Sequence, residues 1–149
     1  MVTQDARFSV LVLNQEVRSL ILSLLRKNEQ FSVGIADLDE LLNPAKKNQD
    51  SIILIDSEAV LTYGAAVISK LKMSCPQCRL ILLCSRVHRS LVKHVMELGA
   101  YGCIIEPYPE WEFATMVRPI LSGQKIDKKI DKGIKASKAK RQGRKPQAN

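Results

Sequence analysis

Two cysteines three positions apart are the first residues whose types and spacing could do chemistry. Cys75 and Cys78 have the CxxC spacing of zinc sites and of thiol–disulfide sites. A zinc site needs two further ligands, and neither histidine of the chain has a partner placed to complete it. A redox CxxC motif opens a helix after a strand, whereas this pair precedes a run that predicts a strand. We therefore predict two ordinary thiols in a surface loop, and a third thiol, Cys103, in the core.

Apolar runs typical of buried strands alternate along the sequence with apolar stripes at helical spacing. These patterns predict the strands and helices that must position any site. Asp37, with Glu40 three residues later, predicts the N-cap of a short helix. Pro76 ends the next helix, Gly99 caps the one after it, and Gly123 follows the last. Five short apolar runs predict buried strands at residues 8–13, 31–36, 51–55, 80–84 and 102–105. Stripes at helical spacing predict helices around residues 17–25, 38–42, 67–71, 91–98 and 113–121.

Strands and helices in strict alternation predict an α/β fold. The expected architecture is a doubly wound five-stranded parallel sheet with helices on both faces, in the flavodoxin-like order 2-1-3-4-5. In that order a ligand binds beyond the carboxyl ends of the first and third strands. The positions of interest therefore follow Leu13 and Ile55, with Cys84 and Ile105 nearby.

Three stretches together resemble the receiver domain of bacterial response regulators, a CheY-like fold. The third predicted strand ends in Asp56, as the strand carrying the family's phosphoacceptor does. Residues 97–107, Glu-Leu-Gly-Ala-Tyr-Gly-Cys-Ile-Ile-Glu-Pro, resemble the passage that normally ends in Lys-Pro. The turn at residues 120–123 is similar to that of receivers joined to helix-turn-helix domains. The resemblance covers residues 8–122 and implies a receiver-like domain followed by a tail, residues 123–149.

The resemblance also implies a phosphorylation pocket of five groups, of which Asp56 alone is in place. The acidic pair that helps to hold Mg²⁺ falls on Asn14 and Gln15, the hydroxyl on Cys84 and the lysine on Glu106. Mg²⁺ requires hard oxygen ligands, and the phosphoryl group requires cations and hydrogen-bond donors. These substitutions predict a pseudo-receiver whose pocket does not work normally.

Glu106 is the most damaging of these changes, because it places an anion where the phosphoryl group needs a cation. Two like charges about 4 Å apart at an effective dielectric of about 20 repel by roughly 4 kcal/mol, which suppresses phosphorylation about a thousandfold. Glu16 and Ser85 are adjacent residues that could replace the acidic pair and the hydroxyl. We interpret Asp56 as a leftover polar residue in preference to a residual phosphoacceptor. A rarer alternative is a divalent-cation site of Glu16, Asp56 and Glu106.

Two aromatic residues at the start of the last predicted helix are candidate interface residues. Tyr108 and Trp111 are flanked by Pro107 and Pro109. Receivers use the face made by the corresponding helix 91–98, strand 102–105 and last helix to dimerise or to bind partners. An exposed tryptophan would be an anchor there. The alternative, a ring folded onto the domain's own surface, is equally compatible with the sequence.

The net charge of +8 lies entirely in the C-terminal segment. Residues 125–149 contain ten basic and two acidic residues, which leaves 13 of each sign in residues 1–124. Without apolar periodicity, this composition is typical of a disordered basic tail. Such a tail can bind nucleic acid through phosphates, dock on an acidic protein or membrane surface, or only promote solubility. The candidate polyanion-binding residues are Lys135, Lys138, Lys140, Arg141, Arg144 and Lys145.

Composition and length limit the class of protein. A chain of 149 residues suits one domain, and its apolar runs are too short to cross a bilayer. The polar first residues lack the apolar core of a signal peptide, so we expect a cytoplasmic protein with reduced cysteines and no disulfide framework. No residue set predicts catalysis. The leading hypothesis is a non-enzymatic signalling module that acts by protein–protein contact without phosphorylation. The alternatives are a nucleic-acid-associated regulator using the tail, and an atypical phosphoacceptor using Asp56.

Overall fold

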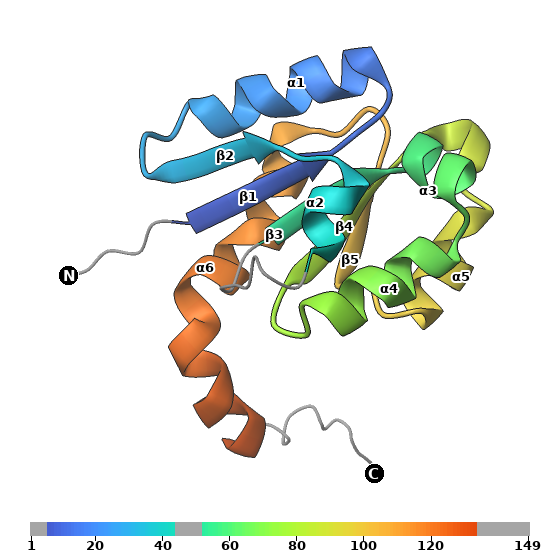
Figure 1. The fold of residues 1–149 in the computed structure, drawn as a ribbon. Helices are drawn as coiled ribbons and strands as arrows, with labels where there is room; N and C mark the ends of the chain where they lie inside the picture. The colour runs from blue at the N-terminus through green and yellow to red at the C-terminus, as the bar shows by residue number, and fades with distance from the viewer. Residues whose placement is uncertain (1–5, 44–51, 134–149) are drawn as a thin grey trace, which may run out of the picture. The chain divides into compact units, whose positions relative to one another are not determined.

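Five parallel strands form the centre of the fold (Figure 1). The structure, a computed structural model, describes the backbone of residues 6–43 and 52–133, and the side chains within residues 7–43 and 52–121. The strand order is β2-β1-β3-β4-β5, which confirms the predicted class and order. The strands are β1 (Ala6–Leu11), β2 (Phe31–Ile35), β3 (Ile52–Asp56), β4 (Arg79–Cys84) and β5 (Gly102–Ile105).

Helices connect successive strands and cover both faces of the sheet (Figure 1). No helix among the described residues is long and apolar enough to cross a bilayer. Asp37 and Glu40 form the predicted capping box at the start of α2. The helices are α1 (Gln15–Arg26), α2 (Leu38–Leu42), α3 (Ser57–Tyr63), α4 (Ala66–Ser74), α5 (Leu91–Glu97) and α6 (Glu110–Gly133), with the 3-10 turn η1 (Arg86–His88) after β4.

The connection between β3 and β4 differs from the prediction of one helix near residues 67–71. It contains two helices, α3 and α4, separated at Gly64. Gly64 has a φ of 94° and a ψ of 148°, a conformation that residues with a Cβ rarely adopt. The apolar stripe of α4 was visible in the sequence, whereas α3 buries only Ala59 and Val60 beside Ser57 and so has no clear stripe.

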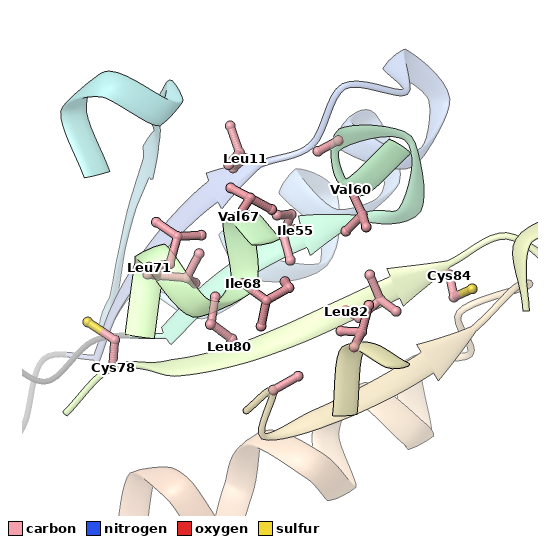
Figure 2. Packing of buried hydrophobic residues seen from close by; sticks show 14 residues of the cluster. Leu11, Ile55, Val60, Val67, Ile68, Leu71, Cys78, Leu80, Leu82 and Cys84 are labelled. Atoms are coloured by element: carbon pink, nitrogen blue, oxygen red, sulfur yellow. The ribbon is translucent and has the colours of Figure 1, made fainter. Parts of the chain in front are cut away.

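The main core lies between the sheet and helices α3, α4 and α5 (Figure 2). Alternate residues of the central strands face it, as the two-residue period of a strand requires. Fully burying an aliphatic side chain of this size stabilises the fold by about 1.5–3 kcal/mol. The core therefore fixes the strand ends where the candidate site lies. Its largest fully buried members are Ile55, Ile68, Leu71, Leu80 and Leu82.

The opposite face of the sheet is covered by α1, whose Ile21 and Leu25 are buried. Phe8 of β1 contacts Phe31 of β2 and Phe113 in the first turns of α6, with ring centroids 4.7 and 6.4 Å apart. This aromatic group ties the beginning of α6 to the edge of the sheet that carries β1 and β2.

Helix α6 runs through two compact units, the first ending at Phe113 and the second beginning at Ala114. In the second unit the helix continues past Gly123 to Gly133, so the predicted helix end at Gly123 is wrong. A glycine inside a helix costs about 1 kcal/mol relative to alanine and does not forbid the helix. The rest of the predicted tail lies outside the described residues, including its six candidate polyanion-binding residues, and stays a prediction.

The prediction of two ordinary thiols in the loop before β4 is also wrong. Cys75 and Cys78 form a disulfide, with Sγ atoms 2.07 Å and Cα atoms 5.4 Å apart. The Cys78 N–H donates to the Cys75 carbonyl at 3.0 Å, and this turn brings the two side chains together. Cys103 is a free thiol on β5 and only partly buried, whereas Cys84 is a free thiol in the core.

Candidate functional site

The candidate site lies where the carboxyl ends of the strands meet. Parallel pairing aligns Leu11 with Ile55 and Cys84 with Ile105. Asp56, which follows Ile55, pairs with Leu83. The sheet therefore brings the predicted positions after the first, third, fourth and fifth strands to one edge, as the strand order requires.

Asp56 is buried, with 2% of its surface exposed, and its carboxylate accepts three backbone hydrogen bonds. Oδ1 accepts from the N–H groups of Leu13 and Ala59, both at 3.0 Å. Oδ2 accepts from the N–H of Asn14 at 2.9 Å. One carboxylate thus caps α3 and fastens the segment after β1 to the end of β3.

Asn14 has a structural role of its own at the start of α1. Its Oδ1 accepts from the Val17 N–H at 3.0 Å, and its Nδ2 donates to Glu58 Oε2 at 2.9 Å. Glu58 was not a sequence candidate, although an acidic residue in the first turn of a helix is a recognisable signal. Gln15 and Glu16 are exposed on the first turn of α1.

The described residues bring no cluster of cation ligands together at this edge. Both oxygens of Asp56 and the amide of Asn14 already hold hydrogen bonds. The cation site predicted from Glu16, Asp56 and Glu106 is not formed, because the described residues include no group of three possible ligands suited to a metal ion. The side chains of Asp56 and Glu106 instead bind different backbone groups, and Glu16 is exposed on α1.

The loop between β4 and α5 is attached to the end of β3 through a serine and a histidine. Ser57 Oγ accepts from the Ser85 N–H at 3.2 Å and shares a hydrogen bond of 2.8 Å with His88 Nδ1. The donor in the second bond depends on the histidine tautomer. Cys84, at the predicted hydroxyl position, is buried and donates to the Ser85 carbonyl at 3.3 Å. Ser57 and His88 were not predicted, because they lie 31 positions apart in the chain.

Glu106 holds the same loop from the other side. Its Oε1 accepts from the Arg86 N–H at 2.9 Å, and its carbonyl accepts from Arg86 Nε at 3.3 Å. Glu106 stands at the position where the receiver resemblance implies a lysine. Its carboxylate is bound to the backbone of the β4–α5 loop.

Three groups near this edge keep their protons at neutral pH. Burial raises the pKa of Cys84, partly opposed by its hydrogen bond with Ser57, and burial raises the pKa of Cys103 to about 12. Burial, then the charge of Glu106, also raises the pKa of Tyr108 far above its usual range. Because the thiolate is the nucleophilic form of cysteine, neither thiol is activated for attack.

Tyr108 and Trp111, both predicted as interface candidates, have different environments. Tyr108 has a φ of 61° and is buried, so the interface prediction is wrong for this residue. The turn after Pro107 directs its ring inward, which the sequence did not reveal. Trp111 has 69% of its surface exposed, so most of its side chain is accessible.

The sequence matches no protein-family model and no curated protein, whereas solved structures match its fold. NtrX from Brucella abortus, solved with ADP, superposes with a TM-score of 0.69 at 17% identity, over 90% of this chain and 30% of its own length. A LuxR-family DNA-binding response regulator from Silicibacter pomeroyi gives 0.63 at 20% identity, over 79% and 93%. A response regulator from Thermotoga maritima gives 0.64 at 17% identity, over 80% and 99%. The chain has the receiver fold. This likeness confirms, at the level of the fold, the receiver resemblance predicted from the sequence. It does not test whether the phosphorylation pocket is altered.

Replacing Asp56 tests its role at the centre of this edge. We expect Asp56→Ala to lower the free energy of unfolding by about 3 kcal/mol, because three N–H groups lose their acceptor. Urea unfolding followed by circular dichroism measures the change. Asp37→Ala is the matched control, since Asp37 is an exposed N-cap that accepts from the Glu40 N–H, and it should cost about 1 kcal/mol. Equal losses in the two variants would contradict the assigned role.

The raised pKa of Cys103 predicts a loss of stability at alkaline pH. The folded protein retains the thiol proton up to about pH 12, whereas the unfolded chain releases it above pH 9.0. Because the unfolded state binds fewer protons in this window, the free energy of unfolding falls as pH rises from 9.0 towards 12. Melting temperatures should fall less steeply for Cys103→Ala than for the unchanged protein. Parallel curves for the two would contradict the raised pKa.

Proposed function

We propose that this protein is a non-enzymatic signalling module with the receiver fold, which works without phosphorylation of Asp56 and acts by contact with another protein. The observation that carries the proposal is the buried carboxylate of Asp56, which accepts three backbone hydrogen bonds. The fold supports a role in two-component signalling, and the arrangement of the edge supports independence from phosphorylation.

Phosphoryl transfer to an aspartate needs an accessible carboxylate oxygen, a cation beside it and donors for the transferred group. Asp56 is 2% exposed, and breaking its bonds to Leu13 and Asn14 would leave two part-buried N–H groups without this acceptor. Glu106 adds negative charge at this edge, where the phosphoryl group requires a cation. Each requirement is therefore opposed by a particular contact.

The position of the β4–α5 loop supports the same proposal. In a working receiver, the phosphoryl group draws a hydroxyl and a lysine towards the aspartate. Here Ser57 binds the loop at Ser85 and His88, and Glu106 binds it at Arg86. The chain's own side chains thus hold the loop in one position, and the module has one resting state available for binding.

Exposed apolar side chains on η1, on α5 and after α5 support a contact surface. Val87 on η1 is 83% exposed, and Met96 and Tyr101 are exposed on and after α5. Trp111, in the first turn of α6, is the large aromatic side chain of this group. Exposed tryptophan is a typical anchor of protein interfaces. We place the protein contact on the side formed by η1, α5, β5 and the start of α6, with a second copy of the chain as the partner to test.

Phosphorylation independence is tested by an amide NMR titration with Mg²⁺ and then beryllofluoride, a mimic of an aspartyl phosphate. We expect no saturable shifts at Asp56, Ala59 or Ser85 at millimolar ligand, because the carboxylate is buried and already accepts three backbone hydrogen bonds. Asp56→Asn, which lacks the phosphoacceptor carboxylate, is the matched control and should respond as the unchanged protein does. Saturable shifts centred on Asp56 that spread to α5 and vanish in Asp56→Asn would show a working pocket.

The contact surface is tested by sedimentation velocity over a range of protein concentrations. Trp111→Ala should weaken self-association about tenfold or more, as loss of an aromatic anchor does. Tyr63→Ala is the matched control, because Tyr63 is a 40% exposed aromatic residue on α3 rather than on the proposed surface. Association that is unaffected by Trp111→Ala, or equally weakened by Tyr63→Ala, would refute this surface for the second-copy partner.

A further inference from the structure

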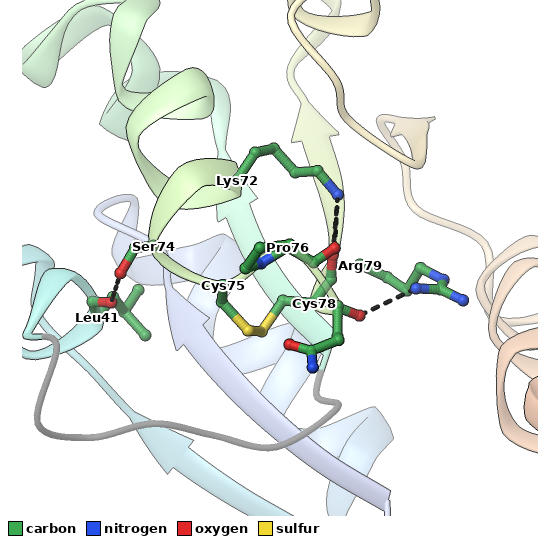
Figure 3. Close-up of a disulfide and its surroundings, with 8 residues drawn as sticks. Leu41, Lys72, Ser74, Cys75, Pro76, Cys78 and Arg79 are labelled. Atoms are coloured by element: carbon green, nitrogen blue, oxygen red, sulfur yellow. Dashed lines mark hydrogen bonds between the residues drawn. A yellow bond between two sulfur atoms is a disulfide. The ribbon is translucent and has the colours of Figure 1, made fainter.

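The Cys75–Cys78 disulfide joins the end of α4 to the residue before β4 (Figure 3). The two residues are three positions apart. A disulfide stabilises a fold mainly by restricting the unfolded chain, and this effect grows with the length of the closed loop. So short a loop gives the bond little value as a structural crosslink.

Other bonds already hold this turn in shape. The Cys78 N–H donates to the Cys75 carbonyl at 3.0 Å, and Lys72 Nζ donates to the Cys78 carbonyl at 3.2 Å. Arg79 Nη1 donates to the Gln77 carbonyl at 2.9 Å, as the dashed lines in Figure 3 show. These hydrogen bonds do not depend on the sulfur–sulfur bond. The reduced loop therefore keeps both thiols adjacent, which favours closure of the disulfide again.

The two sulfurs differ in access. Cys75 is partly exposed at the end of α4, whereas Cys78 is 3% exposed and belongs to the core. An incoming thiolate therefore reaches Cys75 first, and Cys78 is the leaving group. The rate of thiol–disulfide exchange depends on which sulfur is accessible to attack. The difference in exposure therefore makes Cys75 the attacked sulfur.

Lys72 and Arg79 both bind the carbonyls of this turn, so two cations lie against it. Partial burial, and then the charge of Arg79, lowers the pKa of Lys72, which agrees with a locally positive potential. Nearby cations stabilise a thiolate and so make it both a better leaving group and a more abundant nucleophile.

The two remaining cysteines have the opposite character. Cys84 is buried and Cys103 partly buried, burial raises the pKa of both thiols, and neither forms a disulfide. The protein thus contains one disulfide whose Cys75 is partly exposed in a loop contacted by cations, and two free thiols whose pKa values are raised by burial.

We propose that Cys75 and Cys78 are a reversible dithiol–disulfide site that exchanges two electrons with dithiol reductants. A reductant thiolate attacks Cys75 Sγ, the Cys75–Cys78 bond breaks, and Cys78 leaves as a thiolate that takes up a proton. The second thiol of the reductant then attacks its own sulfur in the mixed disulfide and releases Cys75, which is also protonated. The reductant becomes a disulfide, so two electrons and two protons are transferred.

The test is differential alkylation of the native full-length chain, read by mass spectrometry after proteolysis. Iodoacetamide should label none of the four cysteines in the oxidised protein. After treatment with dithiothreitol under native conditions it should label Cys75, and Cys78 more slowly, while Cys84 and Cys103 remain protected until urea is added. In a parallel sample that has not been alkylated, removal of dithiothreitol and addition of excess oxidised glutathione should close the pair again and make Cys75 and Cys78 resistant to iodoacetamide.

Two outcomes would overturn the proposal. Labelling of Cys75 and Cys78 after treatment with excess oxidised glutathione would show that the pair does not close. Resistance of the pair to dithiothreitol until the protein unfolds would show a structural disulfide. Lys72→Gln should slow native alkylation of reduced Cys75 at neutral pH roughly threefold, as loss of a nearby surface charge implies. Lys70→Gln, an exposed change on the same helix, is the matched control, and equal rates in the two variants would remove the role of Lys72.

Discussion

The buried carboxylate of Asp56 is the interaction on which this edge of the structure depends. A carboxylate removed from water must be compensated by donors, and here the donors are backbone N–H groups of Leu13, Asn14 and Ala59. One side chain therefore positions the start of α1, the end of β3 and the start of α3 together. Asn14 and Glu58 extend the network by bonding to each other across the same junction.

The same fold supports different chemistry according to what its side chains bind. In this protein the groups at the strand ends bind one another: Ser57 binds the loop after β4, and Glu106 binds Arg86. Function is decided by such contacts at a site, which is why a shared receiver fold at 17–20% identity carries no pocket with it.

The cysteines illustrate how local surroundings separate residues of one type. Cys84 lies among core residues, Cys103 is partly buried on β5, and both hold their protons. Cys75 and Cys78 lie in a turn whose carbonyls bind Lys72 and Arg79. The reactive form of a thiol is its anion, so the partly exposed Cys75, in a turn contacted by cations, differs from the buried Cys84. The proposed redox site lies at the opposite ends of the strands from Asp56, because β4 begins at Arg79 and ends at Cys84.

The sequence by itself determined the strands, their order and the edge that carries the candidate site, because buried parallel strands and amphipathic helices have distinct hydrophobic periods. It also placed Asp56 at a strand end. Only the tertiary structure decided what Asp56 binds, since two of its three donors lie 42 and 43 positions away. Ser57 and His88 meet for the same reason. Backbone conformation decided the rest: the turn that joins Cys75 to Cys78, the break at Gly64 and the inward ring of Tyr108. These depend on φ, ψ and long-range hydrogen bonds, which residue type and spacing do not specify.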